Sequence, residues 1–247
     1  MADEEGGLVQ GGSVESYGVS KCYDMRVAVL ATGGKDSVLA LHRILNEGYN
    51  VEYLVSMIPL REDSWMFHYP NIHLVDLFAE AVEIPLVKAE TSGIKEKEVE
   101  DLKRLIEKLD IEGVVSGAVA SNYQKTRIEK VCKQLKLKSI MPLWHENELD
   151  ILHEILDIKF KVIITGVYAY GFNRQWLGRK IDEKTVKALI ELNRKYDVSL
   201  VGEGGEYETL VLDASFFKKK IHVVKAEKIW KDQSGYFLIT KAKLENK

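Results

Sequence analysis

The feature that most constrains the fold is an alternation of short apolar runs with amphipathic helical patterns, which begins at Met25. The run at 26–31 is apolar and β-branched, which is typical of a parallel strand buried on both faces. A glycine-rich turn and a helical pattern ending at Gly48 follow it. Such βα repeats favour an α/β fold, an open parallel sheet with helices on both faces. Further strands are predicted at 51–58, 85–89, 113–115 and 139–141, and further helices at 72–82, 94–109 and 121–135.

The rhythm changes after Pro142, where helices and short strands no longer alternate regularly. We therefore expect a first domain at 25–143 and a smaller α+β domain at 144–247. Residues 1–24 combine glycines, serines and acids without apolar periodicity, which predicts a disordered arm. In the second domain, helices are predicted at 148–157 and 183–196, and strands at 161–165, 198–201, 209–212, 219–224 and 236–243, the last two joined as a hairpin by a turn at 232–235.

Composition and charge exclude several classes of protein. With 46% apolar and 30% charged residues and no apolar run of about 20 residues, the sequence predicts a globular protein without a membrane span. The net charge is −3, and the first 24 residues hold five acids against one lysine, so the remainder is nearly neutral and lacks the basic field of a dedicated nucleic-acid binder. Two cysteines, Cys22 and Cys132, cannot form a disulfide framework or a four-thiolate zinc site. With no targeting leader in view, we expect a cytoplasmic location.

The most informative segment is the glycine-rich turn between the first strand and its helix, which we call the phosphate loop. Backbone N–H groups and a helix N-terminus around a concave turn favour an oxyanion, and glycines let a phosphate approach the backbone. The turn matches neither the Walker loop nor the dinucleotide fingerprint, and the alternative is a helix-capping turn shaped by glycines. The phosphate loop consists of Thr32, Gly33, Gly34, Lys35, Asp36 and Ser37.

The phosphate loop resembles the Ser-Gly-Gly-Lys-Asp-Ser loop of the N-type ATP pyrophosphatases, with Thr32 retaining the hydroxyl of the usual serine. The resemblance implies an adenine nucleotide alpha hydrolase-like fold, with ATP and Mg²⁺ as cofactors. It also implies that the loop holds the β- and γ-phosphates while the α-phosphorus is attacked. The catalytic residues implied are Lys35, Asp36 and Ser37, with Asp36 as a candidate Mg²⁺ ligand.

Three further segments, at 64–69, 117–124 and 202–209, narrow the resemblance to the diphthine–ammonia ligases in their compact, archaeal-type form. It extends from about Met25 to Lys220. It implies ATP-dependent amidation of diphthine on translation elongation factor 2, with ammonium as nitrogen donor, through an acyl-adenylate with release of AMP and pyrophosphate. Two alternatives remain. One is a tRNA-modifying enzyme of the thiolase or lysidine type, which the missing paired cysteines and basic domain oppose. The other is an ATP-binding protein without turnover.

The segments after the second and fourth strands supply further candidates, because the carboxyl ends of parallel strands face the ligand crevice. Gly117 and Ser121 are candidates for binding the nucleotide, and Trp65 and His68 for lining the mouth of the cleft. The alternatives are a helix cap at Ser121, a packed or solvated helix face and an aromatic plug. Candidates for binding ribose, phosphate or substrate are Tyr123, Gln124 and Arg127.

We call residues 202–209 the acidic segment. Its carboxylates suit Mg²⁺, or the trimethylammonium group that diphthine, as the resemblance implies, carries. Tyr207 with Glu206 and Glu208, joined by Trp65, is the candidate cage for that cation, and the alternative is a solvated β-turn. The candidate substrate-binding residues here are Glu203, Gly204, Gly205, Glu206, Tyr207, Glu208 and Thr209.

Overall fold

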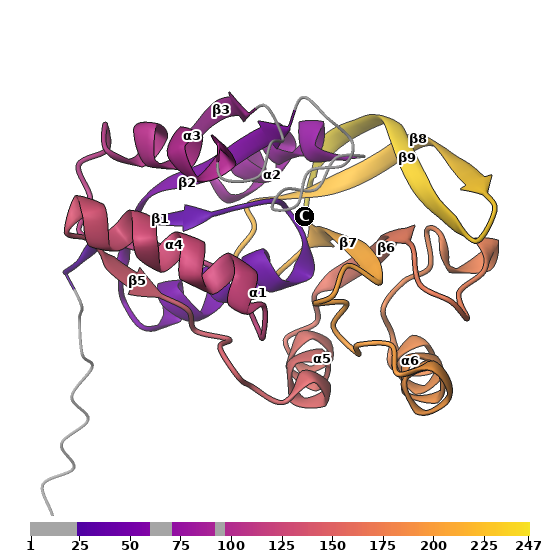
Figure 1. Ribbon diagram of the computed structural model, residues 1–247. Helices are drawn as coiled ribbons and strands as arrows, with labels where there is room; N and C mark the ends of the chain where they lie inside the picture. The colour runs from indigo at the N-terminus through magenta and orange to yellow at the C-terminus, as the bar shows by residue number, and fades with distance from the viewer. Residues whose placement is uncertain (1–23, 60–70, 92–96) are drawn as a thin grey trace, which may run out of the picture.

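The computed structural model describes residues 24–59, 71–91 and 97–247, and the structural statements below concern these residues. Their first half forms the expected five-stranded sheet, in which every pair of neighbouring strands is parallel and the order is β3-β2-β1-β4-β5 (Figure 1). The strands are β1 (Arg26–Leu30), β2 (Asn50–Pro59), β3 (Leu86–Thr91), β4 (Gly113–Val115) and β5 (Lys138–Ile140).

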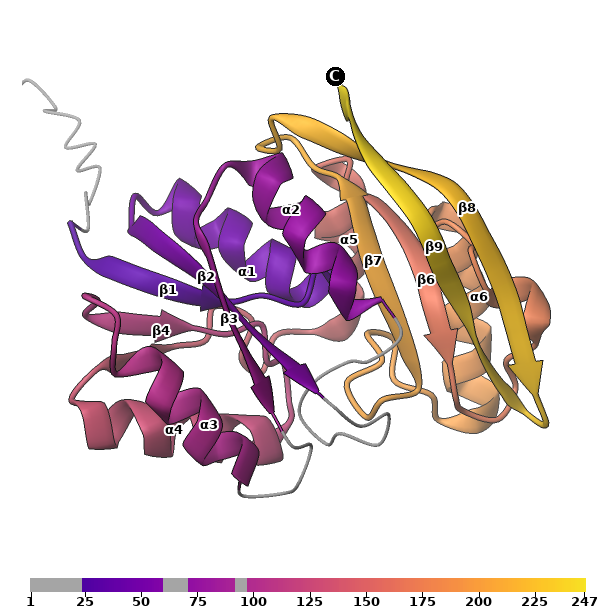
Figure 2. The ribbon, with the colours of Figure 1, turned by 90° about the horizontal axis from the view of Figure 1, so that it is seen from above.

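Helices cover both faces of this sheet, as predicted. Figure 2 shows α1 and α2 on one face and α3 and α4 on the other. Leu39 and Phe78 pack into the core of the first face, and Leu102 and Val131 into that of the second. The strand order reverses between β1 and β4, so the ligand crevice is expected beyond their carboxyl ends. The helices are α1 (Lys35–Asn46), α2 (Val75–Val82) behind the short helix η1 (Ile72–Leu74), α3 (Lys97–Ile106) and α4 (Asn122–Leu135).

The second half forms an antiparallel four-stranded sheet in the order β7-β6-β9-β8, flanked by two helices. The predicted C-terminal hairpin is confirmed, but its strands are longer than expected and its turn is shorter, at Asp232 and Gln233. The elements are α5 (Glu148–Asp157), β6 (Lys161–Val167), η2 (Arg174–Trp176), α6 (Glu183–Tyr196), β7 (Tyr207–Asp213), β8 (Lys219–Lys231) and β9 (Ser234–Asn246).

The strand predicted at 198–201 is wrong, because side chains take up the backbone groups that a strand would use in a sheet. The amide of Leu200 donates to the Glu148 carboxylate at 2.6 Å. The carbonyl oxygens of Leu200 and Val201 accept hydrogen bonds from Tyr207 Oη and Lys35 Nζ. An apolar run therefore forms an irregular connection that is held by its neighbours on both sides.

The two sheets share one apolar core. Phe78 of α2 contacts Phe217, with ring centroids 5.5 Å apart, and the fully buried Leu143 belongs to the same cluster. Arg43 of α1 adds a polar connection, since its guanidinium donates to both carboxylate oxygens of Glu146 at 2.6 and 2.8 Å. The division at residue 143 therefore remains a prediction about sequence units, because the cluster extends across it. Among the helices that the structure describes, none is long and apolar enough to cross a bilayer.

Candidate active site

A cavity of about 680 Å³ opens where the carboxyl ends of β1 and β4 meet the second sheet. This volume lies in the range of small-molecule sites, about 300–1,000 Å³. The cavity collects residues from segments far apart in the chain, and most of the predicted site residues line it. Those are Thr32, Gly34, Lys35, Asp36, Ser37, Gly117, Ser121, Tyr123, Gln124, Glu203, Gly204, Gly205, Tyr207, Glu208 and Thr209.

The phosphate loop turns through Gly33, whose φ of +79° lies in the left-handed region that favours glycine. Hydroxyl groups accept hydrogen bonds from its amides: Thr32 Oγ1 from Gly34 at 3.3 Å, and Thr209 Oγ1 from Lys35 at 3.0 Å. The Ser37 hydroxyl donates to the Gly34 carbonyl at 3.0 Å. A side-chain hydroxyl is an acceptor that a phosphate oxygen can replace without loss of the hydrogen bond. The loop therefore suits an oxyanion.

Lys35 is placed differently from the free positive charge expected in the loop. Its side chain is 2% exposed, and Nζ donates to the two carboxylate oxygens of Asp36 at 3.0 and 2.7 Å and to the Val201 carbonyl. The ammonium also lies 5.3 Å from the centre of the Tyr207 ring. Lys35 lines the cavity and at the same time connects the first turn of α1 to the second half of the chain.

Asp36 fits a magnesium ion only in part. Among the residues that the structure describes, no group of three His, Cys, Asp or Glu side chains is arranged to hold a metal. Mg²⁺ commonly takes one or two carboxylates and completes its octahedron with water and phosphate oxygens. The Asp36 carboxylate, 26% exposed beside the phosphate loop, suits that kind of shared site.

Gly117 brings two loops together at the reversal of strand order. A Cβ atom on Gly117 would lie 2.6 Å from both the carbonyl carbon and oxygen of Asp36 and 2.7 Å from the Ser37 nitrogen. The close approach is therefore to the first turn of α1, whereas the sequence suggested approach to a nucleotide. Ser121 caps α4, because its hydroxyl accepts from the Gln124 amide at 3.3 Å, and it still lines the cavity.

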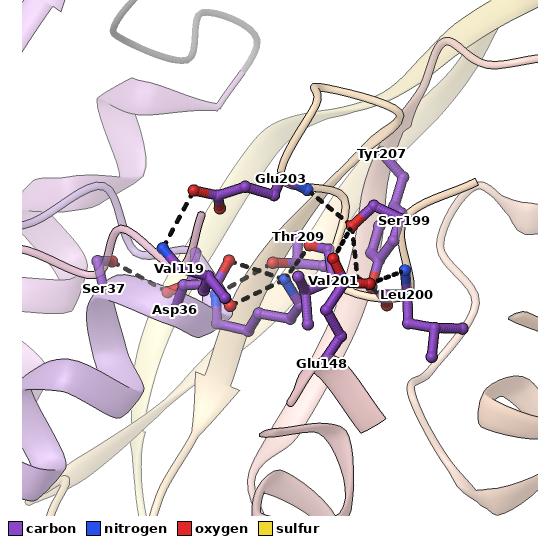
Figure 3. Close-up of polar contacts among 12 residues, drawn as sticks. Asp36, Ser37, Val119, Glu148, Ser199, Leu200, Val201, Glu203, Tyr207 and Thr209 are labelled. Atoms are coloured by element: carbon purple, nitrogen blue, oxygen red, sulfur yellow. Dashed lines mark hydrogen bonds and ion pairs between the residues drawn. The ribbon is translucent and has the colours of Figure 1, made fainter. Parts of the chain in front are cut away.

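Glu203 has a role that the sequence did not indicate. Its Oε1 atom accepts hydrogen bonds from three successive amides before α4, those of Val119, Ala120 and Ser121, at 3.0, 2.9 and 2.7 Å. Figure 3 shows the Glu203 side chain extended toward Val119. Converging amides at a helix N-terminus form an anion-binding concavity. A carboxylate of the acidic segment fills it here.

The central residues of the acidic segment lie toward the core. Tyr207 is 3% exposed, its hydroxyl donates to the Leu200 carbonyl at 2.6 Å, and burial raises its pKa well above the ordinary value. Glu206 Oε1 accepts from the Ser199 amide at 3.2 Å, and Glu206 does not line the cavity. The Glu148 carboxylate accepts from the Ser199 hydroxyl on the other side (Figure 3). Tyr207 and Glu206 thus hold the connection at 199–201.

Four further predicted residues do not line the cavity or cannot be placed. Gly33 forms the left-handed turn of the phosphate loop but does not line the cavity. Arg127 does not line it either, and its guanidinium carbon lies 3.5 Å from the centre of the Tyr123 ring. Trp65 and His68 lie outside the described residues.

Sequence reasoning missed several lining residues from elements that the topology brings in. Tyr168 follows β6 directly and lies outside every predicted element, and Tyr236 lies in a predicted hairpin strand to which the sequence assigns no functional role. Asn71 connects the halves, because its amide donates to the Phe237 carbonyl at 2.9 Å and its oxygen accepts from the Ile239 amide at 3.0 Å. Neither hydrophobic periodicity nor composition predicted that these residues line the cavity, because their positions depend on the strand order of the second sheet.

Cys132 is packed in the core. It lies in α4 at 2% exposure, and burial raises the pKa of its thiol to about 11. A protonated, enclosed thiol is a poor nucleophile and a poor metal ligand. This cysteine therefore contributes to the core and not to the chemistry of the cavity.

Two family models match the chain. One is described as the diphthamide synthase N-terminal domain and matches residues 25–139, and the other as the diphthamide synthase C-terminal domain and matches residues 147–244. A diphthine–ammonia ligase of Rattus norvegicus is 39% identical over 228 residues, which cover 83% of this chain and 85% of the rat chain. That of Danio rerio is 33% identical over 250 residues, covering 90% and 98%. A solved structure from Methanocaldococcus jannaschii, described as a predicted subunit of tRNA methyltransferase, has a TM-score of 0.43 at 16% identity, covering 77% of this chain and 98% of that chain.

Proposed function

This chain belongs to the diphthamide synthase family, and from that premise we propose that it amidates diphthine on translation elongation factor 2 at the expense of ATP. The related proteins are diphthine–ammonia ligases, so the activity is that of a ligase that forms a carbon–nitrogen bond. The finer parts of the proposal are the acyl-adenylate, the use of ammonium and the identity of the factor. A cytoplasmic location completes it, consistent with the sparse use of cysteine.

The observation that carries the proposal is the joining of the phosphate loop and the acidic segment in one cavity. Thr209 at the end of the acidic segment accepts from the Lys35 amide in the loop. A ligase of this kind must bring an activated phosphate and an acceptor carboxylate to the same place, since orientation of the two reactants supplies much of the rate. The contact between the two segments supports that arrangement.

The proposed reaction has two steps. The diphthine carboxylate attacks the α-phosphorus of ATP, which forms the acyl-adenylate and releases pyrophosphate. Ammonia then attacks the acyl carbon, which forms the amide, releases AMP and loses a proton to solvent. The amides and hydroxyls of the phosphate loop donate to the β- and γ-phosphates and stabilise the charge that develops on the leaving group. Bound Mg²⁺, held in part by Asp36, would add electrostatic stabilisation there.

The test of the proposal is a reconstituted amidation. The protein is incubated with ATP, ammonium and elongation factor 2 carrying diphthine, and the factor is then weighed by mass spectrometry. We expect the factor to lose the mass difference between a hydroxyl and an amino group, with AMP and pyrophosphate formed in equal amounts. Omission of ammonium is expected to abolish the amide. ADP as the nucleotide product, or an unchanged factor, would contradict the proposal.

A matched reaction with unmodified tRNA in place of the factor tests the tRNA-modifying alternative. AMP release that depends on tRNA and not on the factor would support that alternative. ATP binding without pyrophosphate release under either condition would support a protein that binds ATP without turnover. The reconstitution therefore separates all three functions that the phosphate loop allows.

A further inference from the structure

A row of three residues crosses the second sheet at the cavity. Gly166 of β6 pairs with Glu208 of β7 on one side and with Tyr236 of β9 on the other. Directly opposed residues of antiparallel strands project to the same face of a sheet. Glu208 and Tyr236 both line the cavity, so the side chains of this row project toward the cavity. The register of β6 shifts between Ile164 and Gly166, an irregularity of the kind that redirects side chains next to active sites.

Tyr168 lies on the middle of this row. A Cβ atom at position 166 would come within 2.5 Å of the Tyr168 hydroxyl and 2.9 Å of two ring carbons, so the ring rests where only glycine leaves room. The Tyr168 amide donates to the Glu206 carbonyl at 2.8 Å, which fixes the backbone where the strand ends. The hydroxyl hydrogen-bonds to Glu208, and desolvation together with the negative charge of Glu208 raises the Tyr168 pKa far above its ordinary value. The phenol therefore stays neutral.

Tyr168 as a whole is 40% exposed, and it lines the cavity. Two phenol rings and one carboxylate thus meet on one face. Among the described residues that line the cavity, the only lysine or arginine is Lys35, whose ammonium is occupied by Asp36 and Val201. Quaternary ammonium groups have no N–H to donate, and proteins hold them against aromatic rings with a carboxylate nearby. Tyr207 also lines the cavity but is less suited to this task, because it belongs to the buried core and the Lys35 ammonium already lies 5.3 Å from the centre of its ring.

We propose that Tyr168, Tyr236 and Glu208 form a subsite for a quaternary ammonium group, which we call the tyrosine subsite. This inference rests on the proposed function, in which the acceptor carries both a trimethylammonium group and the carboxylate to be activated. Glu208 belongs to the tyrosine subsite, and the next residue, Thr209, contacts the phosphate loop. Neighbouring positions of β7 therefore place the cation of the acceptor and the phosphates of ATP within one cavity.

The first test measures binding without turnover. The probe is tetramethylammonium, and saturation-transfer NMR from the protein to its methyl protons reports contact. We expect transfer with the unmodified protein, its loss in Tyr168→Leu and Tyr236→Leu, and its loss in Gly166→Ala, where the new methyl displaces the Tyr168 ring. Tyr170→Leu is the matched control, because Tyr170 is 67% exposed, lies two residues away and does not line the cavity. Equal transfer in the control and the subsite variants would overturn the proposal.

The second test uses the reconstituted amidation. Loss of one aromatic wall is expected to raise KM for the diphthine-bearing factor about 5–30-fold, equivalent to about 1–2 kcal/mol of cation–π attraction, with a smaller change in kcat. Tyr168→Phe retains the ring and is expected to restore most of the affinity. The Kd for ATP and the thermal midpoint should stay unchanged, which excludes misfolding. An unchanged KM in Tyr168→Leu would overturn the subsite, whereas absence of amidation by the unmodified protein would overturn the proposed function and leave the NMR result standing.

Discussion

Lys35 connects the phosphate loop to the stretch at 199–206, and the two segments differ in the balance of local and distant contacts that hold them (Figure 3). Within the loop, groups a few residues apart satisfy one another, as when Thr32 Oγ1 accepts from Gly34 and Ser37 Oγ donates to Gly34. The loop's distant partner is Thr209, which accepts from the Lys35 amide. The stretch at 199–206 has local bonds as well, from the Val201 and Glu203 amides to Ser199 Oγ, but its backbone also binds the side chains of Glu148 and Lys35, 52 and 166 residues away.

This difference explains what each region can do. A turn held by its own hydroxyls, by the Thr209 hydroxyl and by a following helix can keep its shape while a phosphate oxygen replaces one of those acceptors. A stretch whose backbone is bound by distant side chains keeps its shape only while the two halves of the molecule stay in place. Removing Glu148 should disturb only the stretch at 199–206, whereas crowding the place where the phosphate loop meets the residues after β4 should disturb the loop. The following variants test that distinction, beginning with the largest expected effect.

Gly117→Ala should be the most damaging. The added methyl meets backbone atoms of Asp36 and Ser37 at 2.6–2.7 Å, and backbone cannot rotate away as a flexible side chain can. We expect a loss of about 1–3 kcal/mol in the free energy of unfolding. Displacement of the loop should also reduce kcat about 100-fold. Urea denaturation and single-turnover amidation measure the two effects. Gly205→Ala is the control, since nothing lies within 4 Å of a Cβ there, although its φ of +84° adds backbone strain.

Glu148→Ala should come next and should act only on the second region. It leaves the Ser199 hydroxyl and the Leu200 amide without their acceptor, at a cost of about 1–3 kcal/mol in unfolding free energy. Hydrogen exchange should accelerate at Leu200 and remain slow in β1. Glu191→Ala, which removes an exposed partner of Arg194, should change stability by no more than about 0.5 kcal/mol. Faster exchange throughout the phosphate loop would refute the distinction between the regions.

Glu203→Gln is expected to have a moderate effect. The glutamine oxygen still accepts from the amides at 119–121 but lacks the negative charge that strengthens those bonds. We expect a loss of about 1 kcal/mol in unfolding free energy, and a larger loss in Glu203→Ala. Guanidinium denaturation of both variants gives the comparison. If the glutamine variant were as unstable as the alanine variant, the charge would not be what the three amides require.

Thr209→Val should be the smallest change. It removes the hydroxyl that accepts from the Lys35 amide, at about 0.5–1 kcal/mol, and Thr209→Ser should restore it. A bound phosphate can supply the missing acceptor, so the deficit should shrink when ATP saturates the protein. Thermal unfolding with and without ATP measures this. A deficit that stays constant with ATP would indicate that no phosphate reaches this amide.

Local sequence patterns predicted much of the fold of the first half of the chain. The apolar run at 26–31 and the glycine-rich turn after it predicted both β1 and the position of the phosphate loop, because a buried strand, a turn and a helix are consecutive in the chain. The acidic segment was located by its family resemblance, not by a strand and helix pattern, and most of its residues line the cavity. Their contacts were not predictable, since Glu203 meets amides 82–84 residues away.

The second sheet shows why local pattern fails. Its order places β9 between β6 and β8, so Tyr236 pairs with Gly166, which lies 70 positions earlier in the chain. The run at 198–201 has the composition of a strand but no free edge to join, because Glu148, Tyr207 and Lys35 already occupy its backbone groups. A side chain distant in the sequence can bind the backbone of a segment and so override that segment's strand propensity. The hydrophobic periodicity of a single sequence does not show such a contact.

The apolar core shared by both sheets has a consequence for how the molecule comes apart. Phe217 packs on Phe78, and the Lys218 amide donates to the Ala81 carbonyl at 2.7 Å, so the second sheet covers part of α2. A fragment ending near residue 143 would present that apolar surface to water and would tend to aggregate. Heating should melt the protein in a single cooperative transition, with equal calorimetric and van't Hoff enthalpies.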